Sequence, residues 1–248
     1  MPKSSAELDI VLWGATGFTG QLVAEALARG KHGVRWALAG RDLKKLERVR
    51  EGLAALDPAC ATLPLILADA GDAASLEALA RRTRVVSSTV GPYARYGSEL
   101  VAACVRAGTD YCDLTGEVQW MRRMVDAHHA EAERTGARIV HACGFDSIPS
   151  VLGTLMLQEH MRTQHGGHCD AVRFYMGRMK GGASGGTVAS MLTALDEAAV
   201  DPGVRRTTRV FTLAITKGPV QLESSSLYFT PTWSRPSGPR RFGSGSSA

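Results

Sequence analysis

Short apolar runs alternate with longer segments of helical spacing along the first 145 residues. Residues 8–13 form an apolar run that ends at Gly14, as expected of a strand buried on both faces. Residues 18–29 then place leucine, valine and alanine side chains on one face of a predicted helix, which Gly30 ends. This first unit therefore reads as strand, glycine turn and helix.

The same alternation continues downstream. Further strands are predicted at residues 34–40, 63–69, 84–91, 110–116 and 137–144, and further helices at 43–56, 73–82, 98–108 and 118–136. Parallel neighbours in a sheet need a crossover between them, usually a helix. Six such alternations predict an α/β fold with a mostly parallel, doubly wound sheet.

The pattern changes after Gly144. A helix is predicted at residues 148–161 with Pro149 in its first turn, a strand at Cys169–Gly181, and a glycine-rich loop that opens a helix within residues 182–198. These elements predict the start of a second α/β or α+β domain whose sheet is built separately.

The last 25 residues contain eight serines, three glycines and three prolines, with no acid and no periodicity. Such a segment buries too little apolar surface to offset its ordering entropy, so residues 224–248 are predicted to be a disordered tail. The chain is thus divided into a first domain at residues 1–145, a partial second domain at residues 146–223, and this tail.

The net charge of +5 is concentrated near the C-terminus. Residues 203–248 contribute seven basic residues and one acid, which leaves residues 1–202 at a net charge of −1. The body of the protein is therefore nearly neutral, and a nucleic-acid partner is not expected.

Five widely spaced cysteines include no C-x-x-C pair, so reduced thiols and no structural zinc are expected. His128 and His129 are adjacent and would point about 100° apart on a helix, so no metal site is expected there. No apolar run has the length of a membrane span and the N-terminus lacks a signal peptide, so a cytoplasmic protein is expected.

Three glycines follow the first strand, Gly14, Gly17 and Gly20, in a G-x-x-G-x-x-G pattern. In a dinucleotide-binding fold such glycines permit the tight turn, the approach of the pyrophosphate and the packing of helix on strand. The helix N-terminus supplies N–H groups, and the hydroxyls of Thr16 and Thr19 can add contacts. The alternative is a tight structural turn without a ligand.

The end of the second strand indicates which dinucleotide binds. NAD-binding proteins commonly place an acidic residue there, whereas this chain has Gly40 followed by Arg41. A guanidinium binds phosphate in bidentate fashion, which favours NADP with its 2′-phosphate. The alternative for Arg41 is a solvated surface charge.

Two more strand ends are expected to border the cofactor. Asp69 ends the third strand, and Val90, Gly91 and Pro92 follow the fourth strand near the topological switch point. The alternatives are that Asp69 caps the next helix and that Tyr93 and Tyr96 only pack at an edge. The predicted cofactor-binding residues are Gly14, Ala15, Thr16, Gly17, Phe18, Thr19, Gly20, Gly40, Arg41, Asp69, Val90, Gly91 and Pro92.

Several other enzyme classes lack their residues in this chain. No tyrosine has a lysine four residues later, which disfavours a classical short-chain dehydrogenase. There is also no Walker lysine motif and no H-E-x-x-H pair.

Five stretches carry a resemblance to a known family: "GATGFTG", "LAGRD", residues 88–117, "CGFDSIPS" and "GGASGGTVAS". Through them, residues 9–197 resemble the saccharopine dehydrogenase-like oxidoreductases, which include the trans-acting enoyl reductases. The resemblance implies a Rossmann-type NADP-binding domain and a second domain for substrate or dimerisation. It also implies NADPH-dependent reduction of a lipid-like or polyketide-derived acyl substrate, membrane association in some members and a homo-oligomer.

Alternatives remain open at this stage. Nothing after about Asp201 matches the family, so a truncated or frame-shifted product that binds NADP without turnover is one hypothesis. An acyl-phosphate or phosphosugar reductase is another, with Cys143 as its candidate cysteine or, more simply, a buried small hydrophobe. Candidate proton donors or substrate contacts are Tyr93, Tyr111, Glu117 and Asp146, and their spacing fixes no role.

Overall fold

A computed structural model describes residues 6–30, 32–175 and 185–208. The strands are β1 (Leu8–Trp13), β2 (Trp36–Gly40), β3 (Leu65–Leu67), β4 (Thr83–Ser88), β5 (Asp110–Asp113) and β6 (Ile139–Val140). The helices are α1 (Phe18–Gly30), α2 (Leu43–Leu56), the 3-10 helix η2 (Pro58–Thr62), α3 (Ala73–Arg81), α4 (Tyr93–Tyr96), α5 (Ser98–Ala107), α6 (Val118–Thr135), α7 (Ile148–His165), α8 (Gly185–Val200) and α9 (Pro202–Thr208).

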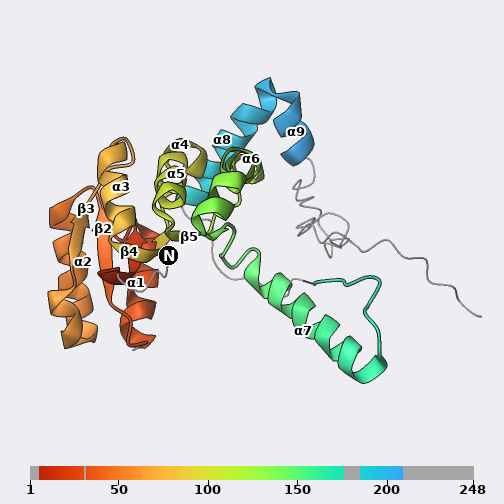
Figure 1. The fold of residues 1–248 in the computed structure, drawn as a ribbon, viewed down its shortest axis with the longest axis horizontal. Coiled ribbons are helices and arrows are strands. Elements are labelled where there is room, and N and C mark those ends of the chain that lie inside the picture. Colours follow the sequence, from red (N-terminus) through yellow and green to blue (C-terminus); the bar gives the residue numbers. More distant parts are fainter. Residues whose placement is uncertain (1–5, 31, 176–184, 209–248) are drawn as a thin grey trace, which may run out of the picture.

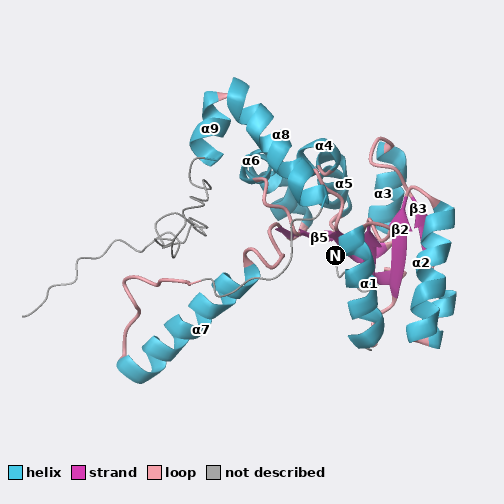
Figure 2. Ribbon diagram, turned by 180° about the vertical axis from the view of Figure 1, so that it is seen from behind, coloured by secondary structure: helices cyan, strands magenta, loops and turns pink. Residues whose placement is uncertain are grey.

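The six strands form one parallel sheet in the order β3-β2-β1-β4-β5-β6. This is the Rossmann order: β2 and β3 lie on one side of β1, and β4, β5 and β6 lie on the other, so the switch point is between β1 and β4. Helices cover both faces, as Figure 1 and Figure 2 show. The predicted doubly wound parallel sheet is therefore confirmed.

Each face of the sheet has its own apolar core. On one face, Leu12 and Leu38 of the sheet pack with Ala24 of α1 and Leu46 of α2. On the other face, a second cluster joins the sheet to α3, α5 and α6 and includes Trp120. Burial on both faces explains why β2 and residues 10–13 of β1 are apolar rather than alternating.

The elements after residue 146 are helices in the part of the chain that the structure describes. The predicted strand Cys169–Gly181 does not form over its described part, Cys169–Tyr175, where only Phe174 makes a bridge. A strand needs a ladder partner, and the alternating side chains that suggested one here are largely exposed. The rest of that strand and the predicted tail at 224–248 lie outside the described residues, and the two-domain division stays a prediction.

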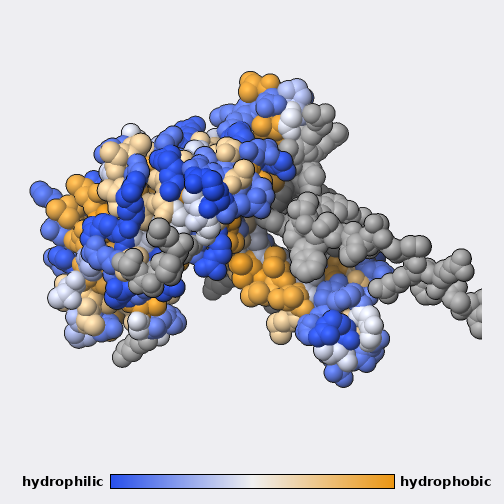
Figure 3. Space-filling view, viewed as in Figure 1, coloured by the Kyte–Doolittle hydropathy of each residue, from blue (hydrophilic) through white to orange (hydrophobic). Residues whose placement is uncertain are grey.

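Helix α7 projects away from the sheet domain (Figure 1) and has no buried residue. Apolar side chains gather over its first half, where Figure 3 shows an orange patch, and Val151, Leu155 and Met156 are among the exposed residues. In the described part of the chain no helix is both long and apolar enough to span a membrane.

Candidate cofactor-binding site

A cleft of about 730 Å³ lies where β1, β2 and β4 end. Its size is within the usual range for small-molecule sites, and its place is the switch point at which open α/β sheets bind ligands. The cleft is lined by Trp13, Gly14, Thr16, Gly17, Phe18, Thr19, Gly40, Arg41, Asp69, Ala70, Gly71, Thr89, Val90, Gly91, Arg95, Tyr96, Gly185 and Gly186.

Ten of the thirteen predicted cofactor residues are on this lining. The other three, Ala15, Gly20 and Pro92, are buried behind it. Sequence reasoning did not find the lining residues Trp13, Arg95 and the pair Gly185–Gly186, along with several small neighbours. Arg95, Gly185 and Gly186 lie in stretches that carry the family resemblance, but strand order and helix packing bring them to the cleft, and the sequence did not show this placement.

The glycine turn has the geometry that a phosphate-binding turn requires. Gly14 has φ of +87°, and a Cβ there would lie 2.5 Å from Cγ2 of Val90. At Gly20 a Cβ would lie 2.1 Å from the Gly14 carbonyl oxygen, so α1 packs directly on the turn. At Gly17 it would meet only that same oxygen, at 3.4 Å, and this position faces open space. The residues present therefore fit a dinucleotide pyrophosphate at the start of α1.

Arg41 lines the cleft directly after β2. Its guanidinium makes no hydrogen bond or ion pair within the described part of the chain. The neighbouring Asp42 is engaged elsewhere, because its carboxylate caps α2 by accepting from the backbone N–H of Lys45 at 3.1 Å. The Arg41 guanidinium is thus available for a 2′-phosphate.

The Asp69 carboxylate orders the turn after β3. Its Oδ1 accepts from the backbone N–H of Gly71 at 2.8 Å, while Asp72 is the residue that caps α3. Asp69 therefore keeps a place on the lining and is not the helix cap that was its alternative. Of the two tyrosines, Tyr96 lines the cleft and Tyr93 is buried.

Glu117, one of the candidate proton donors, holds α4 in place. Its buried carboxylate accepts from the backbone N–H groups of Tyr93 and Ala94, both at 2.8 Å. The Ser190 hydroxyl of α8 donates to Glu117 Oε1 at 2.7 Å. Both oxygens are therefore occupied, and the carboxylate connects α4 with α6 and α8.

A buried polar cluster lies one strand further along the sheet edge. Asp113, at the end of β5, accepts from the Ala142 N–H at 3.1 Å and contacts Nδ1 of His141 at 2.7 Å. Ala142 has φ of +58°, an uncommon conformation for a residue with a Cβ. Nε2 of His141 has no hydrogen-bond partner within the described part of the chain. Sequence reasoning did not single out His141 or Asp113.

Asp146 and Cys143 are exposed and are not on the cleft lining. The expectation that Cys143 is a buried small hydrophobe is wrong, because the turn after β6 carries it to the surface. Partial burial raises the pKa of its thiol, which opposes a reactive thiolate. The structure thus offers no support for a cysteine-dependent acyl-phosphate reductase.

Burial, with the nearby Asp113 carboxylate, raises the pKa of the Tyr93 phenol well above its usual value. A raised folded-state pKa contributes stability that is present below the unfolded value of about 10 and is lost as the pH rises above it. We therefore expect Tyr93→Phe to flatten the loss of unfolding free energy between about pH 9 and pH 11.

The same substitution removes the hydrogen bond from the Tyr93 hydroxyl to the Ser88 carbonyl, at 3.2 Å, and we expect a cost of about 1 kcal/mol at neutral pH. Urea unfolding at a series of pH values measures both effects. Tyr175→Phe, at an exposed position, is the control and leaves the slope unchanged. An unaltered slope in Tyr93→Phe would contradict the assignment.

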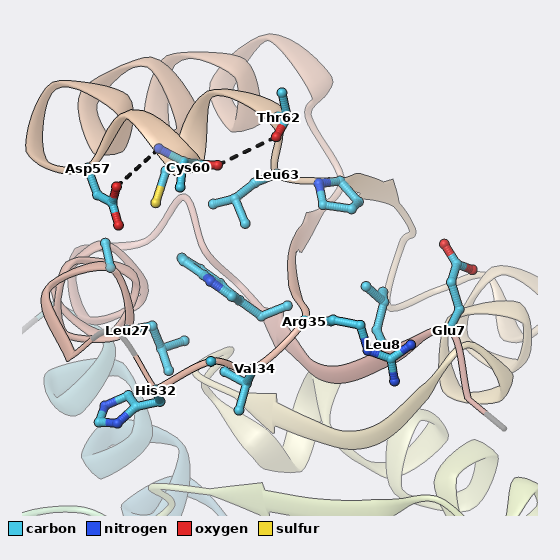
Figure 4. A pocket seen from close by; sticks show the side chains of 15 residues that line it. Glu7, Leu8, Leu27, His32, Val34, Arg35, Asp57, Cys60, Thr62 and Leu63 are labelled. Carbon is cyan, nitrogen blue, oxygen red and sulfur yellow. Dashed lines mark hydrogen bonds between the residues drawn. The ribbon is translucent and has the colours of Figure 1, made fainter. Parts of the chain in front are cut away.

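A second hollow, of about 620 Å³, lies at the opposite edge of the sheet (Figure 4). Trp36, Leu27 and Leu63 contribute apolar surface to it. Its main charged groups are already engaged, since Glu7 pairs with Arg82 at 2.8 Å and Arg35 pairs with Asp9 at 3.1 Å. The glycine turn and Arg41, whose guanidinium has no ion pair within the described residues, line the first cleft, which is therefore the candidate site.

The fold and the cleft together define a protein that binds a nicotinamide dinucleotide. The family model for the saccharopine dehydrogenase NADP binding domain matches residues 10–140, more than half of the chain. The chain belongs to this family, as its resemblance predicted, and its cofactor is NADP(H).

Curated proteins of mycobacteria are similar to most of this chain. A Mycobacterium tuberculosis relative in the trans-acting enoyl reductase group is 50% identical over 206 residues, which are 83% of this chain and 48% of the relative. The trans-acting enoyl reductase of Mycobacterium leprae is 46% identical over 215 residues, 86% of this chain and 51% of its own. This chain therefore spans about half the length of these relatives.

Among solved structures, apo saccharopine dehydrogenase (L-Glu forming) from Saccharomyces cerevisiae matches with a TM-score of 0.50 and 19% identity. The match covers 63% of this chain and 32% of the yeast chain. At this identity the likeness supports the fold alone.

Proposed function

We propose that this chain is the NADPH-binding part of an enoyl reductase that acts on a lipid-like or polyketide-derived acyl substrate. The observation that carries the proposal is the uncommitted Arg41 guanidinium, which shares one cleft with the glycine turn. The names of the mycobacterial relatives supply the reaction class. A homo-oligomer and peripheral membrane association stay predictions.

Residues at one end of the cleft would bind the cofactor, and residues at the other end would bind the substrate. The backbone N–H groups at the start of α1 would hold the pyrophosphate, and Arg41 the 2′-phosphate. When bound, NADPH supplies a hydride. Gly91, Tyr96 and the start of α8 border the end of the cleft beyond β4, and they would orient the acyl group and exclude water there.

A cofactor titration tests whether Arg41 binds the 2′-phosphate. We expect Arg41→Gln to weaken NADP⁺ binding by about 1 to 3 kcal/mol, because a charge-assisted pair with the 2′-phosphate is lost, and to leave NAD⁺ binding nearly unchanged. Isothermal titration calorimetry measures both affinities. Arg29→Gln, at an exposed position on α1, is the control. Equal weakening for both dinucleotides would show that Arg41 does not contact the 2′-phosphate.

NADPH oxidation against a panel of enoyl thioesters tests the reaction class. Oxidation of an enoyl compound supports the proposal, whereas tight cofactor binding with no oxidation of any substrate would contradict it.

A further inference from the structure

Arg95 is an exposed arginine of α4 that lines the cleft. Many described arginines have an acidic partner, as Arg123 has Glu197 at 3.2 Å and Arg138 has Asp110 at 2.5 Å. The Arg95 backbone N–H donates to the Pro92 carbonyl at 3.2 Å, but its guanidinium makes no hydrogen bond or ion pair within the ranges that the structure describes. An uncommitted guanidinium in a ligand cleft is a candidate for anion recognition.

The helix that carries Arg95 is firmly held. Glu117 caps the first turn of α4 through the N–H groups of Tyr93 and Ala94, and Ser190 ties the same carboxylate to α8. The buried Tyr93 ring packs against Trp120, with ring centroids 5.5 Å apart. The backbone position of Arg95 is therefore fixed before any ligand arrives, which lowers the entropic cost of binding.

Strand order places Arg95 away from the phosphates of the cofactor. Arg41 follows β2, the glycine turn follows β1, and Arg95 follows β4, while the sheet order is β2-β1-β4. In this fold the 2′-phosphate and pyrophosphate are held at the ends of β2 and β1. These two elements account for the anionic groups of NADP, and Arg95 is on the other side of the turn.

The surroundings of Arg95 suit a second anion. The cleft lining contains one carboxylate, Asp69, which follows β3 on the far side of β2 and already accepts from a backbone N–H. Tyr96, next to Arg95, offers a phenol as a further donor, and Gly185 and Gly186 leave the lining without side chains at the start of α8. A planar guanidinium donates two parallel hydrogen bonds to the oxygens of a carboxylate or a phosphate.

We propose that Arg95 recognises an anionic group, a carboxylate or a phosphate, on the acyl substrate. This inference rests on the proposed function, because it assigns the substrate end of the same cleft. It makes Arg95 a specificity residue: the enzyme prefers an enoyl compound with a negative group over its neutral analogue.

Matched pairs of probes test the inference on the full chain with saturating NADP⁺. Crotonic acid is compared with methyl crotonate, and S-crotonyl phosphopantetheine with S-crotonyl pantetheine, by calorimetry. We expect the anionic member of at least one pair to bind about tenfold more tightly or better. The first pair reports a carboxylate and the second a phosphate.

Variants then assign the preference to Arg95. We expect Arg95→Gln to remove the preference, Arg95→Lys to retain part of it, and both to leave the dissociation constant of NADP⁺ within about twofold. Arg106→Gln, on the exposed side of α5, is the matched arginine control and retains the full preference.

The outcomes separate this inference from the proposed function. Failure of the unaltered chain to bind NADP⁺ would overturn the proposed function itself. Normal NADP⁺ binding with equal affinity for charged and neutral probes, or with no binding of any probe, would overturn only the role of Arg95. Strong weakening of NADP⁺ binding in Arg95→Gln would instead make Arg95 a cofactor-binding residue.

Discussion

Gly20→Ala is expected to lower the free energy of unfolding by about 3 kcal/mol or more and to abolish measurable NADP⁺ binding. The added Cβ would lie 2.1 Å from the Gly14 carbonyl oxygen and 2.9 Å from Cα of Ala15. Both atoms belong to the backbone, so no side-chain rotation relieves the overlap. Helix α1 would have to move away from β1, and its N–H groups would move with it.

Urea unfolding followed by tryptophan fluorescence measures the stability loss, and calorimetry measures the binding. Gly52→Ala is the control, since a Cβ there meets nothing within 4 Å, and alanine is favoured over glycine in a helix by about 1 kcal/mol. We expect that variant to be as stable as the unaltered chain or more stable. NADP⁺ binding retained within twofold in Gly20→Ala would show that the turn is more adaptable than its packing indicates.

Gly17→Ala separates stability from binding within the same turn. Its Cβ would make only an ordinary contact with the Gly14 carbonyl oxygen, at 3.4 Å. The free energy of unfolding is therefore expected to change by no more than about 0.5 kcal/mol. The methyl group would nevertheless occupy the side that the pyrophosphate approaches, so weaker NADP⁺ binding is expected. Loss of stability equal to that of Gly20→Ala would contradict this division of roles.

Glu117→Ala is expected to cost about 3 kcal/mol of unfolding free energy. The substitution leaves two N–H groups of α4 and the Ser190 hydroxyl without the carboxylate that accepts from them. Glu117 is 2% exposed, so water cannot readily replace it. Urea unfolding measures the loss, and Glu51→Ala, on the exposed face of α2, is the control.

Glu117→Gln distinguishes the capping role from proton donation. An amide retains one acceptor oxygen and turns an NH₂ group toward the remaining donors, so a smaller loss of stability is expected, about 1 to 2 kcal/mol. If Glu117 were instead the proton donor, the glutamine variant would keep its stability and lose NADPH oxidation. That result would overturn the capping assignment.

Helix boundaries were predictable where local signals are strong. Helix α2 was predicted at residues 43–56 and is observed as Leu43–Leu56, with Asp42 as its cap. Strands were predicted too long, as at β6, which covers only Ile139–Val140 of the predicted 137–144. The length of a strand depends on hydrogen bonds to a neighbouring strand, and the sequence of one strand does not contain that information.

The candidate site likewise contains residues that local sequence predicted and residues that only the structure revealed. The glycine turn and Arg41 follow from residues close together in the chain, whose spacing relates directly to backbone conformation and strand ends. Glu117 was a candidate proton donor by residue type, and only its contacts with α4 and α8 revealed a structural task. The Asp113–His141 contact joins residues 28 positions apart, and no sequence motif links the two residues.

Periodicity, glycine spacing and the residue after β2 act over a few positions, so they were enough to predict the doubly wound sheet, the dinucleotide turn and NADP as the cofactor. Which side chains share the cleft became clear only from the folded chain. Arg95 and the glycines of α8 are about 90 residues apart, and they meet because Glu117 holds α4 and α8 together. Such placement depends on packing and long-range hydrogen bonds, and local sequence patterns contain no information about them.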